Sequence, residues 1–380
     1  MTRDIVVVGG GTGGTVLANR LVERLGPELA DGTVAVTVVT DSPDQLYKPK
    51  WLYVPFGRAT PEEARRPVAE LLDRRVDLDV ARVEALDAPA HELTLADGRT
   101  LGYDDLVVAT GSVLAPERVP GLAEGAHGFY GESDAVALRD ALAGFEGGRL
   151  VVSVAGMPHM CPAAPYEFAL VAEDWLRERG LRGATDLVYT YPTERMHAKP
   201  ALADWGEPVF AERDIAVETS FVPTRVDPDA ETIAAEDGRS LAYDLLVAVP
   251  PHRGVDFVAE AGLGEDGWVE VDRHTLAATR APDVFAVGDA ADVPTSKAGS
   301  VAHYEAGTVA SRLAARARGE TPTATYDGKT LCFVEAGLDE ATFVEFEYGE
   351  EPVVREPSRA LHWAKLAYNE SYWLTARGVL

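Results

Sequence analysis

A cysteine occupies a turn in which a dinucleotide-binding unit would carry glycines. Cys161 and Pro162 follow an apolar run at 150–155 that predicts a buried strand, and a helical pattern covers 168–179. Because proline suits the first position of a helix, we expect Cys161 at or near the helix N-cap. The positive end of the helix dipole favours a thiolate there, which is typical of sulfur redox chemistry. The alternative is a small buried residue without a chemical role.

The second cysteine, Cys332, lies far from Cys161 in the sequence, in the first strand of a hairpin that we expect over 330–348. Two cysteines so far apart form neither a CxxC redox motif nor a zinc site, so we expect no metal. No signal peptide is recognisable, which favours a cytoplasmic location. In that location, two cysteines are more typical of catalysis than of a structural disulfide.

A nucleotide-binding pattern opens the chain. Gly9, Gly11 and Gly14 match G-x-G-x-x-G between an apolar strand at 4–8 and a helix that we expect over 15–25. Glycines at this spacing let the backbone close on a pyrophosphate at the helix N-terminus. Asp41 follows the next predicted strand, where an acidic side chain would hold ribose hydroxyls. We therefore predict a bound dinucleotide; the alternative is a tight glycine turn without a ligand.

Two further segments could contact such a cofactor. A strand at 284–287 ends in Gly288 and Asp289, ahead of a helix that we expect from about 300 to 316, and an aspartate at this place can hydrogen-bond a polyol. The aromatic loop at 45–58 could wall a flat ring or simply cover the surface, and the sequence leaves both interpretations open.

The chain repeats one pattern. Residues 96–109 return as 236–249, and each copy predicts an Asp-Gly hairpin turn, a strand and a buried strand. Each copy closes a unit that begins with a strand and a helix, so the sequence predicts two related α/β units. The first unit keeps its nucleotide glycines and ends in Ala109, Thr110 and Gly111, whereas the second has lost them.

Composition limits the partners. The 380 residues include 35 basic and 62 acidic side chains, a net charge of -27, which argues against binding nucleic acid. The acidity is dispersed and lysine is scarce, which is typical of proteins from salt-loving organisms. No apolar run is long enough to span a membrane. The tail at 360–374 is rich in Trp and Tyr, and it could lie in a membrane interface or pack on the body.

Together these motifs resemble a known family. The glycine motif with Asp41, the Ala-Thr-Gly at 109–111 and the Val-Phe-Ala-Val-Gly-Asp at 284–289 resemble the FAD-dependent pyridine nucleotide–disulfide oxidoreductases. The segments at 161–167, 297–299 and 362–365, together with Cys332, resemble the sulfide:quinone oxidoreductases over nearly the whole chain.

This resemblance implies an α/β fold with two three-layer Rossmann-like domains of the glutathione-reductase type, plus a C-terminal β-hairpin and amphipathic helix. The FAD-binding domain would comprise 1–115 and 250–320, the second Rossmann-like domain 116–249, and the C-terminal segment 321–380.

The resemblance also implies a set of site residues. Cys161 and Cys332 would form the redox pair, Glu167 would handle protons, and Lys297 would stabilise the reduced flavin; His197 is a looser match to a histidine near the site. The residues implied at FAD are Gly9, Gly11, Gly14, Asp41 (adenosine ribose), Thr110, Gly111, Gly288 and Asp289 (ribityl chain). Many relatives carry a third cysteine where this chain has Tyr130, so we expect FAD to be bound non-covalently.

The implied reaction begins with hydrosulfide attacking an oxidised sulfur bridge between the two cysteines, which leaves a persulfide on one of them. Two electrons pass through FAD to a membrane quinone, and sulfur leaves as polysulfide or zero-valent sulfur. The enzyme would bind peripherally to the inner face of the cell membrane through its C-terminal segment, and it could form a homo-oligomer.

Three alternatives remain. A type II NADH:quinone reductase would need a glycine-rich second turn, but 156–161 holds one glycine and Pro158 removes an amide donor. The flavin subunit of a flavocytochrome c sulfide dehydrogenase would have a haem-carrying partner and an export signal. A non-catalytic FAD-binding protein would be inert to sulfide, thiols and NADH.

Overall fold

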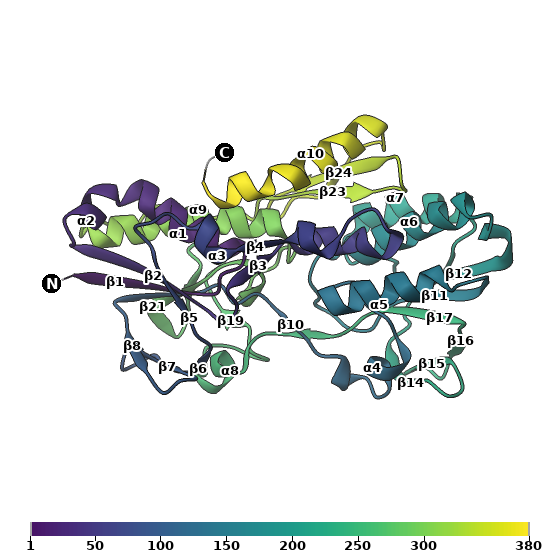
Figure 1. The fold of residues 1–380 in the computed structure, drawn as a ribbon, viewed down its shortest axis with the longest axis horizontal. Coiled ribbons are helices and arrows are strands. Elements are labelled where there is room, and N and C mark those ends of the chain that lie inside the picture. The colour runs from purple at the N-terminus through teal and green to yellow at the C-terminus, as the bar shows by residue number, and fades with distance from the viewer. Residues whose placement is uncertain (1, 379–380) are drawn as a thin grey trace.

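Strands from distant parts of the chain form the first sheet of the computed structural model, which describes residues 2–378 (Figure 1). The sheet is parallel except for β20, and its order is β20-β21-β9-β1-β2-β5. Ile5 to Val8 in β1 are all buried, because a parallel sheet is covered on both faces. The strands are β1 (Arg3–Val8), β2 (Val34–Thr40), β5 (Asp77–Val80), β9 (Asp105–Val108), β20 (Ala277–Ala278) and β21 (Ala281–Ala286).

The helices α1 (Thr12–Arg24) and α9 (Gly299–Ala317) pack against each other beside this sheet. An antiparallel meander of β6 (Val83–Asp87), β7 (Glu92–Leu95) and β8 (Thr100–Gly102) shares the same apolar core. Smaller elements complete this half: α2 (Gly26–Ala30), β3 (Asp44–Leu46), β4 (Arg65–Pro67), α3 (Val68–Leu71), α8 (Asp256–Glu260), β19 (Val269–Glu270) and β22 (Ala291–Asp292).

The second sheet is fully parallel in the order β13-β12-β11-β17. Its strands are β11 (Gly148–Val154), β12 (Thr185–Thr190), β13 (Ala216–Glu218) and β17 (Leu245–Val249). The helices of this half are α4 (Leu122–Gly125), α5 (Glu132–Ala143), α6 (Ala164–Glu178) and α7 (Pro200–Glu212), and its meander is β14 (Pro223–Asp227), β15 (Thr232–Ala235) and β16 (Ser240–Ala242).

The sequence repeat is confirmed as two equivalent strand–meander units. Each copy contains the second hairpin of a meander followed by a buried parallel strand, β9 in one case and β17 in the other. Gly98 and Gly238 occupy the same place in the two hairpin turns, at φ 83° and 88°, a backbone conformation that favours glycine. The α/β class with two Rossmann-like halves is therefore confirmed.

Two short strands cross between the halves. β10 (Val113–Leu114) leaves the first sheet and pairs antiparallel with β18 (His252–Arg253), which returns from the second. The domain boundaries near these crossings stay a prediction.

The C-terminal segment lies over both halves (Figure 1). The expected hairpin is confirmed as β23 (Thr330–Glu335) and β24 (Ala341–Phe346), to which β25 (Val353–Val354) adds a third strand. Helix α10 (Arg359–Ala376) crosses this hairpin and reaches α1. Within residues 2–378, no helix combines the length and the apolarity that crossing a membrane requires.

Helix α10 packs with an unusual polarity. Lys365, Asn369, Tyr372 and Ala376 are buried, whereas the Trp363 side chain is 68% exposed. Polar side chains on the inner face fix the helix to the rest of the protein and leave large apolar side chains outside. The tail therefore packs on the body and still presents an apolar outer face, so the two expectations for this segment are not exclusive.

Candidate active site

A cavity of about 920 Å³ extends from the N-terminus of α1 to both cysteines and α10. This volume is at the upper end of the roughly 300–1,000 Å³ typical of small-molecule sites. Its lining includes these predicted site residues: Gly9, Gly11, Asp41, Thr110, Gly111, Cys161, Glu167, Gly288, Asp289, Lys297 and Cys332. Gly14 and His197 are not among the lining residues.

At the nucleotide end of the cavity, the three glycines of the motif have different structural roles. A Cβ on Gly9 would lie 2.3 Å from the Ala109 oxygen, and one on Gly14 would lie 1.9 Å from the Gly9 oxygen, so both are needed for close backbone contact. Nothing lies within 4 Å of a Cβ on Gly11, which faces the cavity. The first turn of α1 contains no acidic residue, so its amides can accept an anion such as pyrophosphate.

Two neighbouring segments extend this end of the cavity. Asp41 lies exposed directly after β2, where the sequence places it. The Thr110 hydroxyl is buried without a hydrogen-bond partner, and Gly111 has φ 71° with open space around it. A buried polar atom without a partner is costly, so Thr110 fits a site that a polar ligand completes. These residues fit the phosphate and ribose groups of a dinucleotide.

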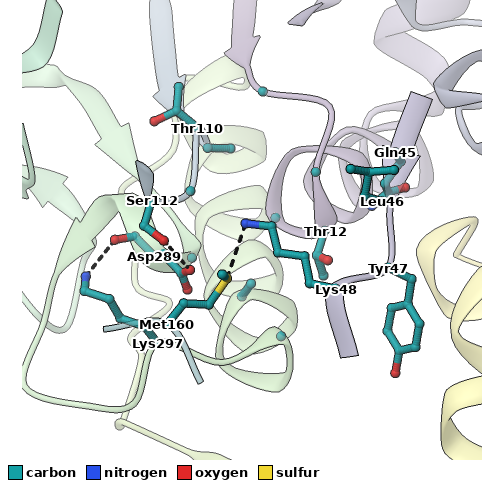
Figure 2. A pocket seen from close by; sticks show the side chains of 18 of the residues that line it. Thr12, Gln45, Leu46, Tyr47, Lys48, Thr110, Ser112, Met160, Asp289 and Lys297 are labelled. Carbon is teal, nitrogen blue, oxygen red and sulfur yellow. Dashed lines mark hydrogen bonds between the residues drawn. The ribbon is translucent and has the colours of Figure 1, made fainter. Parts of the chain in front are cut away.

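The Asp289 turn forms the next part of the wall (Figure 2). Ser112 Oγ donates a hydrogen bond to Asp289 Oδ2 at 3.1 Å, and Lys297 Nζ donates to the Asp289 carbonyl at 2.7 Å. The Lys297 ammonium also lies 3.8 Å from the centre of the Trp268 ring. Burial lowers the pKa of Lys297, although Asp289 works in the opposite direction. The cation is therefore held beside the cavity in a partly dehydrated position.

A buried carboxyl supports this turn from behind. Glu305 on α9 accepts a hydrogen bond from the Gly288 amide at 2.5 Å, and its other oxygen is buried without a partner. Burial raises the pKa of Glu305 to about 8. Sequence reasoning missed this residue because a single glutamate in an amphipathic helix gives no sign of which side it faces.

The backbone holds Cys161 from both sides. The Cys161 amide donates to the Lys297 carbonyl at 2.7 Å, and the Cys161 carbonyl accepts from the Tyr130 hydroxyl at 3.3 Å. Cys161 has φ 46°, in the left-handed region that side chains other than glycine rarely adopt. These contacts fix the thiol at the cavity wall and connect the cysteine turn to the lysine that lies next to Asp289.

Cys161 lies two residues before the N-cap of the helix, near the expected position but not at it. Helix α6 begins at Ala164, before the expected Phe168, with Ala163 as the N-cap and Pro165 in the first turn. The left-handed turn at Cys161 separates the cysteine from the helix. Burial raises the pKa of Cys161, and the nearby Glu167 and Cys332 add to this effect; the amide of Ala164 at the start of α6 lowers the pKa but does not outweigh burial.

Cys332 reaches the same cavity from β23. Burial raises the pKa of its thiol to about 12, and Glu167 adds to the effect. Both cysteines are free in this structure. Two thiols from separate halves of the sequence therefore line the cavity that begins at the nucleotide glycines.

Behind the cysteines lies a network of buried charges. The Glu167 carboxylate accepts hydrogen bonds from the Lys365 ammonium and from the Glu335 amide. Burial raises the pKa of Glu167, although Lys365 opposes this. Burial alone would lower the pKa of Lys365, but the carboxylates of Glu167 and Glu335 outweigh it and hold the pKa well above its usual value. Lys365 is therefore a buried ammonium at the cavity wall.

The family model for pyridine nucleotide-disulphide oxidoreductases matches residues 3–319. The chain belongs to this family. The first Rossmann-like half and the whole second half lie within the matched residues.

Individual proteins and solved structures are similar to this chain over most of its length. The mitochondrial sulfide:quinone oxidoreductase of Mus musculus is 26% identical over 366 residues, which cover 93% of this chain and 80% of that protein. An NADH dehydrogenase-like protein of Mycobacterium tuberculosis is 28% identical over 77% of this chain and 73% of its own length. The solved sulfide:quinone oxidoreductase of Aquifex aeolicus has the same fold, with a TM-score of 0.87, 22% identity, and coverage of 100% of this chain and 92% of that one.

His197 is not brought to the cavity of this family member. Its ring is buried, its Nδ1 accepts a hydrogen bond from the Lys199 amide at 2.9 Å, and it stacks on Tyr191. Burial lowers its pKa to about 4. The contacts of His197 hold the segment before α7 in place.

The aromatic loop at 45–58 does more than cover the surface. Its residues Gln45 to Pro49 and Leu52 line the cavity, and Lys48 Nζ points at the Met160 sulfur at 3.3 Å (Figure 2). Tyr47 stacks on Tyr372 of α10 with ring centres 4.0 Å apart. The loop therefore joins the nucleotide end of the cavity to the C-terminal helix.

Proposed function

We propose that the protein is an FAD-dependent sulfide:quinone oxidoreductase. The observation that carries this proposal is that Cys161 and Cys332 line one cavity together with the glycine turn of the first half. The similarity to sulfide:quinone oxidoreductases over most of the chain supports it.

The residues that would hold FAD follow from the cavity. FAD supplies a two-electron carrier between the sulfur chemistry and the quinone. The amides at Gly11 and the start of α1 would bind the pyrophosphate, Asp41 the adenosine ribose, and Asp289 the ribityl chain. Lys297 would place its positive charge at the isoalloxazine ring. The resemblance implies that Tyr130 stands where many relatives carry a third cysteine, and the cofactor would therefore be held non-covalently.

The cysteines would act as the sulfur acceptor. Hydrosulfide attacks an oxidised Cys161–Cys332 bridge; the bond between the cysteines breaks, a bond to the incoming sulfur forms, and the other cysteine leaves as a thiolate. A second hydrosulfide removes the bound sulfur as polysulfide. Re-oxidation of the two thiols to the bridge releases two electrons, which reduce the quinone.

Helix α10 would face the membrane. Trp363, Tyr368 and Leu374 are 68%, 36% and 45% exposed, and Tyr368 also lines the cavity. A quinone could therefore enter beside Tyr368 from an interface that binds the outer face of α10. We propose that this interface is the inner face of the cell membrane, and that the dispersed negative charge is an adaptation to high salt.

The domains proposed above, 1–115 with 250–320, 116–249, and 321–380, agree with where β10 and β18 cross between the sheets. Self-association of the protein is part of the same proposal, and the oligomeric state in solution tests it.

Anaerobic mixing with sulfide tests the function. Sulfide should bleach the flavin absorbance of the purified protein, and Cys161→Ser or Cys332→Ser should slow this by at least about 100-fold, because neither variant can form the bridge. Val80→Gln, an exposed change at β5, is the matched control and should bleach at the native rate. If both cysteine variants also bleach at the native rate, the proposed function is wrong.

The alternative of an NADH:quinone reductase is not favoured by the comparisons, although an NADH dehydrogenase-like protein of Mycobacterium tuberculosis is similar over 77% of this chain. The turn at 156–161 in the second half does not fit NADH. Gly156 is packed against Pro251, whose Cβ would lie 2.9 Å from a Cβ on Gly156. Pro158 has no amide to donate to a pyrophosphate. Stopped-flow mixing with NADH separates the two candidates. Fast bleaching by NADH and none by sulfide would select the second.

A further inference from the structure

The buried charges behind the cysteines continue to the protein surface. Glu335 accepts hydrogen bonds from Tyr53 at 2.5 Å on one carboxylate oxygen, and its other oxygen lies 3.0 Å from His362 Nδ1. The side chain of Glu335 is 1% exposed, whereas that of His362 is 13% exposed. The network therefore begins at the cavity wall with Lys365 and ends at a histidine that reaches solvent.

The gaps along this network are short. Lys365 Nζ is hydrogen-bonded to Glu167 and lies 3.8 Å from Glu335 Oε1. A lysine ammonium on its flexible stem can move between two carboxylates at that separation. The elements that supply these groups are β23, α6, α10 and the loop that carries Tyr53, and together they surround Glu335.

The net charge of the network is small with or without one extra proton. Glu167 and Glu335 contribute two negative charges and Lys365 one positive charge, so the sum is zero when His362 is protonated and -1 when it is neutral. Transfer of one proton onto or off His362 therefore moves the net charge of the network only between zero and -1. Because an uncompensated buried charge is costly, a larger imbalance would be disfavoured.

The reaction requires such a proton. Oxidation of hydrosulfide to zero-valent sulfur releases two electrons and one proton, whereas reduction of a quinone takes up two electrons and two protons. Each turnover of the proposed function therefore consumes one proton from solution.

We propose that His362 and Glu335 form a proton relay from the surface to Lys365 at the cavity wall, where the proton is delivered during quinone reduction. This inference rests on the proposed function. His362 takes the proton from water, Glu335 passes it inward, and the Lys365 ammonium presents it to the cavity. His362 and Glu335 act through Lys365 and do not touch the cavity themselves.

The test separates flavin reduction from flavin re-oxidation. Holoprotein is reduced with sulfide, or in a parallel arm with dithionite, and is then mixed with decylubiquinone in weak buffer containing a pH-indicator dye. In His362→Gln, reduction by sulfide should be unchanged, whereas re-oxidation and proton uptake should slow together by at least roughly tenfold. His91→Gln is the matched control, because His91 also pairs with a carboxylate, Asp283, near the surface.

Chemical rescue distinguishes a relay from a structural role. Added imidazole should restore proton uptake in His362→Gln, because it can replace the partly exposed histidine. It should not restore proton uptake in Glu335→Gln, because that variant interrupts the relay at a buried position. As a readout besides turnover, the reduced-minus-oxidised infrared spectrum of the wild type should contain a carboxyl band that Glu335→Gln removes.

Two outcomes would overturn the relay: native proton uptake in His362→Gln, or a loss that imidazole fails to restore. Failure of sulfide to bleach the wild-type flavin would instead contradict the proposed function, and the dithionite arm would still decide on the relay.

Discussion

Glu305 is a buried acid whose protonation should be visible in the stability of the protein. Burial raises its pKa in the folded state to about 8, from an ordinary value of 4.5. Between these values the unfolded chain releases the proton and the folded chain keeps it, so stability falls as pH rises through this range. Glu305→Gln keeps an acceptor for the Gly288 amide and removes the titration.

We therefore expect the difference in unfolding free energy between Glu305→Gln and the wild type to shift in favour of the variant by a few kcal/mol from pH 5 to pH 9. Thermal unfolding of both proteins at both pH values measures this shift. Glu260→Gln, an exposed change on α8, should leave the pH dependence of the wild type in place. Parallel curves for the wild type and Glu305→Gln would show that the carboxyl does not titrate in this range.

At the residue scale, local motifs could be predicted and buried polar contacts could not. Gly9 and Gly14 are required by close backbone contacts within one short turn, so their spacing carries the information. Glu335 is different, because its neighbours Tyr53 and His362 come from remote segments. The left-handed turn that places Cys161 two residues before the N-cap could not be predicted, because it depends on contacts with Lys297 and Tyr130.

At the element scale, α10 joins the cavity to an apolar outer face. Its buried positions are partly polar, and several of its large apolar side chains are exposed. The hydrophobic pattern of the sequence therefore does not show which side of the helix packs inward. The sequence therefore predicted the helix and its Trp and Tyr content, but it could not predict which of these rings are exposed. The hairpin beneath it was predictable because strand, turn and strand are contiguous.

Binding to lipid vesicles tests the outer face of α10. The double variant Trp363→Gln and Leu374→Gln should bind vesicles of bacterial lipids at least about tenfold more weakly, because each exposed apolar side chain contributes on the order of 1 kcal/mol when it enters the interface. Val80→Gln removes an exposed apolar side chain from β5, outside α10, and should bind like the wild type. Equal binding of all three proteins would contradict a membrane role for this face.

At the scale of the whole molecule, the net charge of -27 makes the chain repel itself. A net charge of -27 destabilises the folded state at low ionic strength, and salt screens this repulsion, since the Debye length falls from about 10 Å at 0.1 M to about 3 Å at 1 M. The two-unit architecture was predictable from the repeat, but the placement of the C-terminal segment over both units was not, because it depends on side-chain contacts between distant parts.

We expect the melting temperature to rise by several degrees between 0.1 M and 2 M KCl at pH 7. The effect should shrink at pH 5, close to the isoelectric point of about 4.6, because the net charge is then small. A melting temperature that is independent of KCl at pH 7 would contradict the proposed adaptation to salt.

The contact between α10 and the glycine turn has a consequence for biosynthesis. The Tyr372 hydroxyl shares hydrogen bonds with Thr12 at 2.7 Å and Gln45 at 2.6 Å, and Asn19 donates to the Ala376 carbonyl at 2.8 Å. Thr12 and Asn19 precede their partners by 360 and 357 residues along the chain. The nucleotide end of the cavity therefore closes only after α10 has been synthesised and has folded back onto α1.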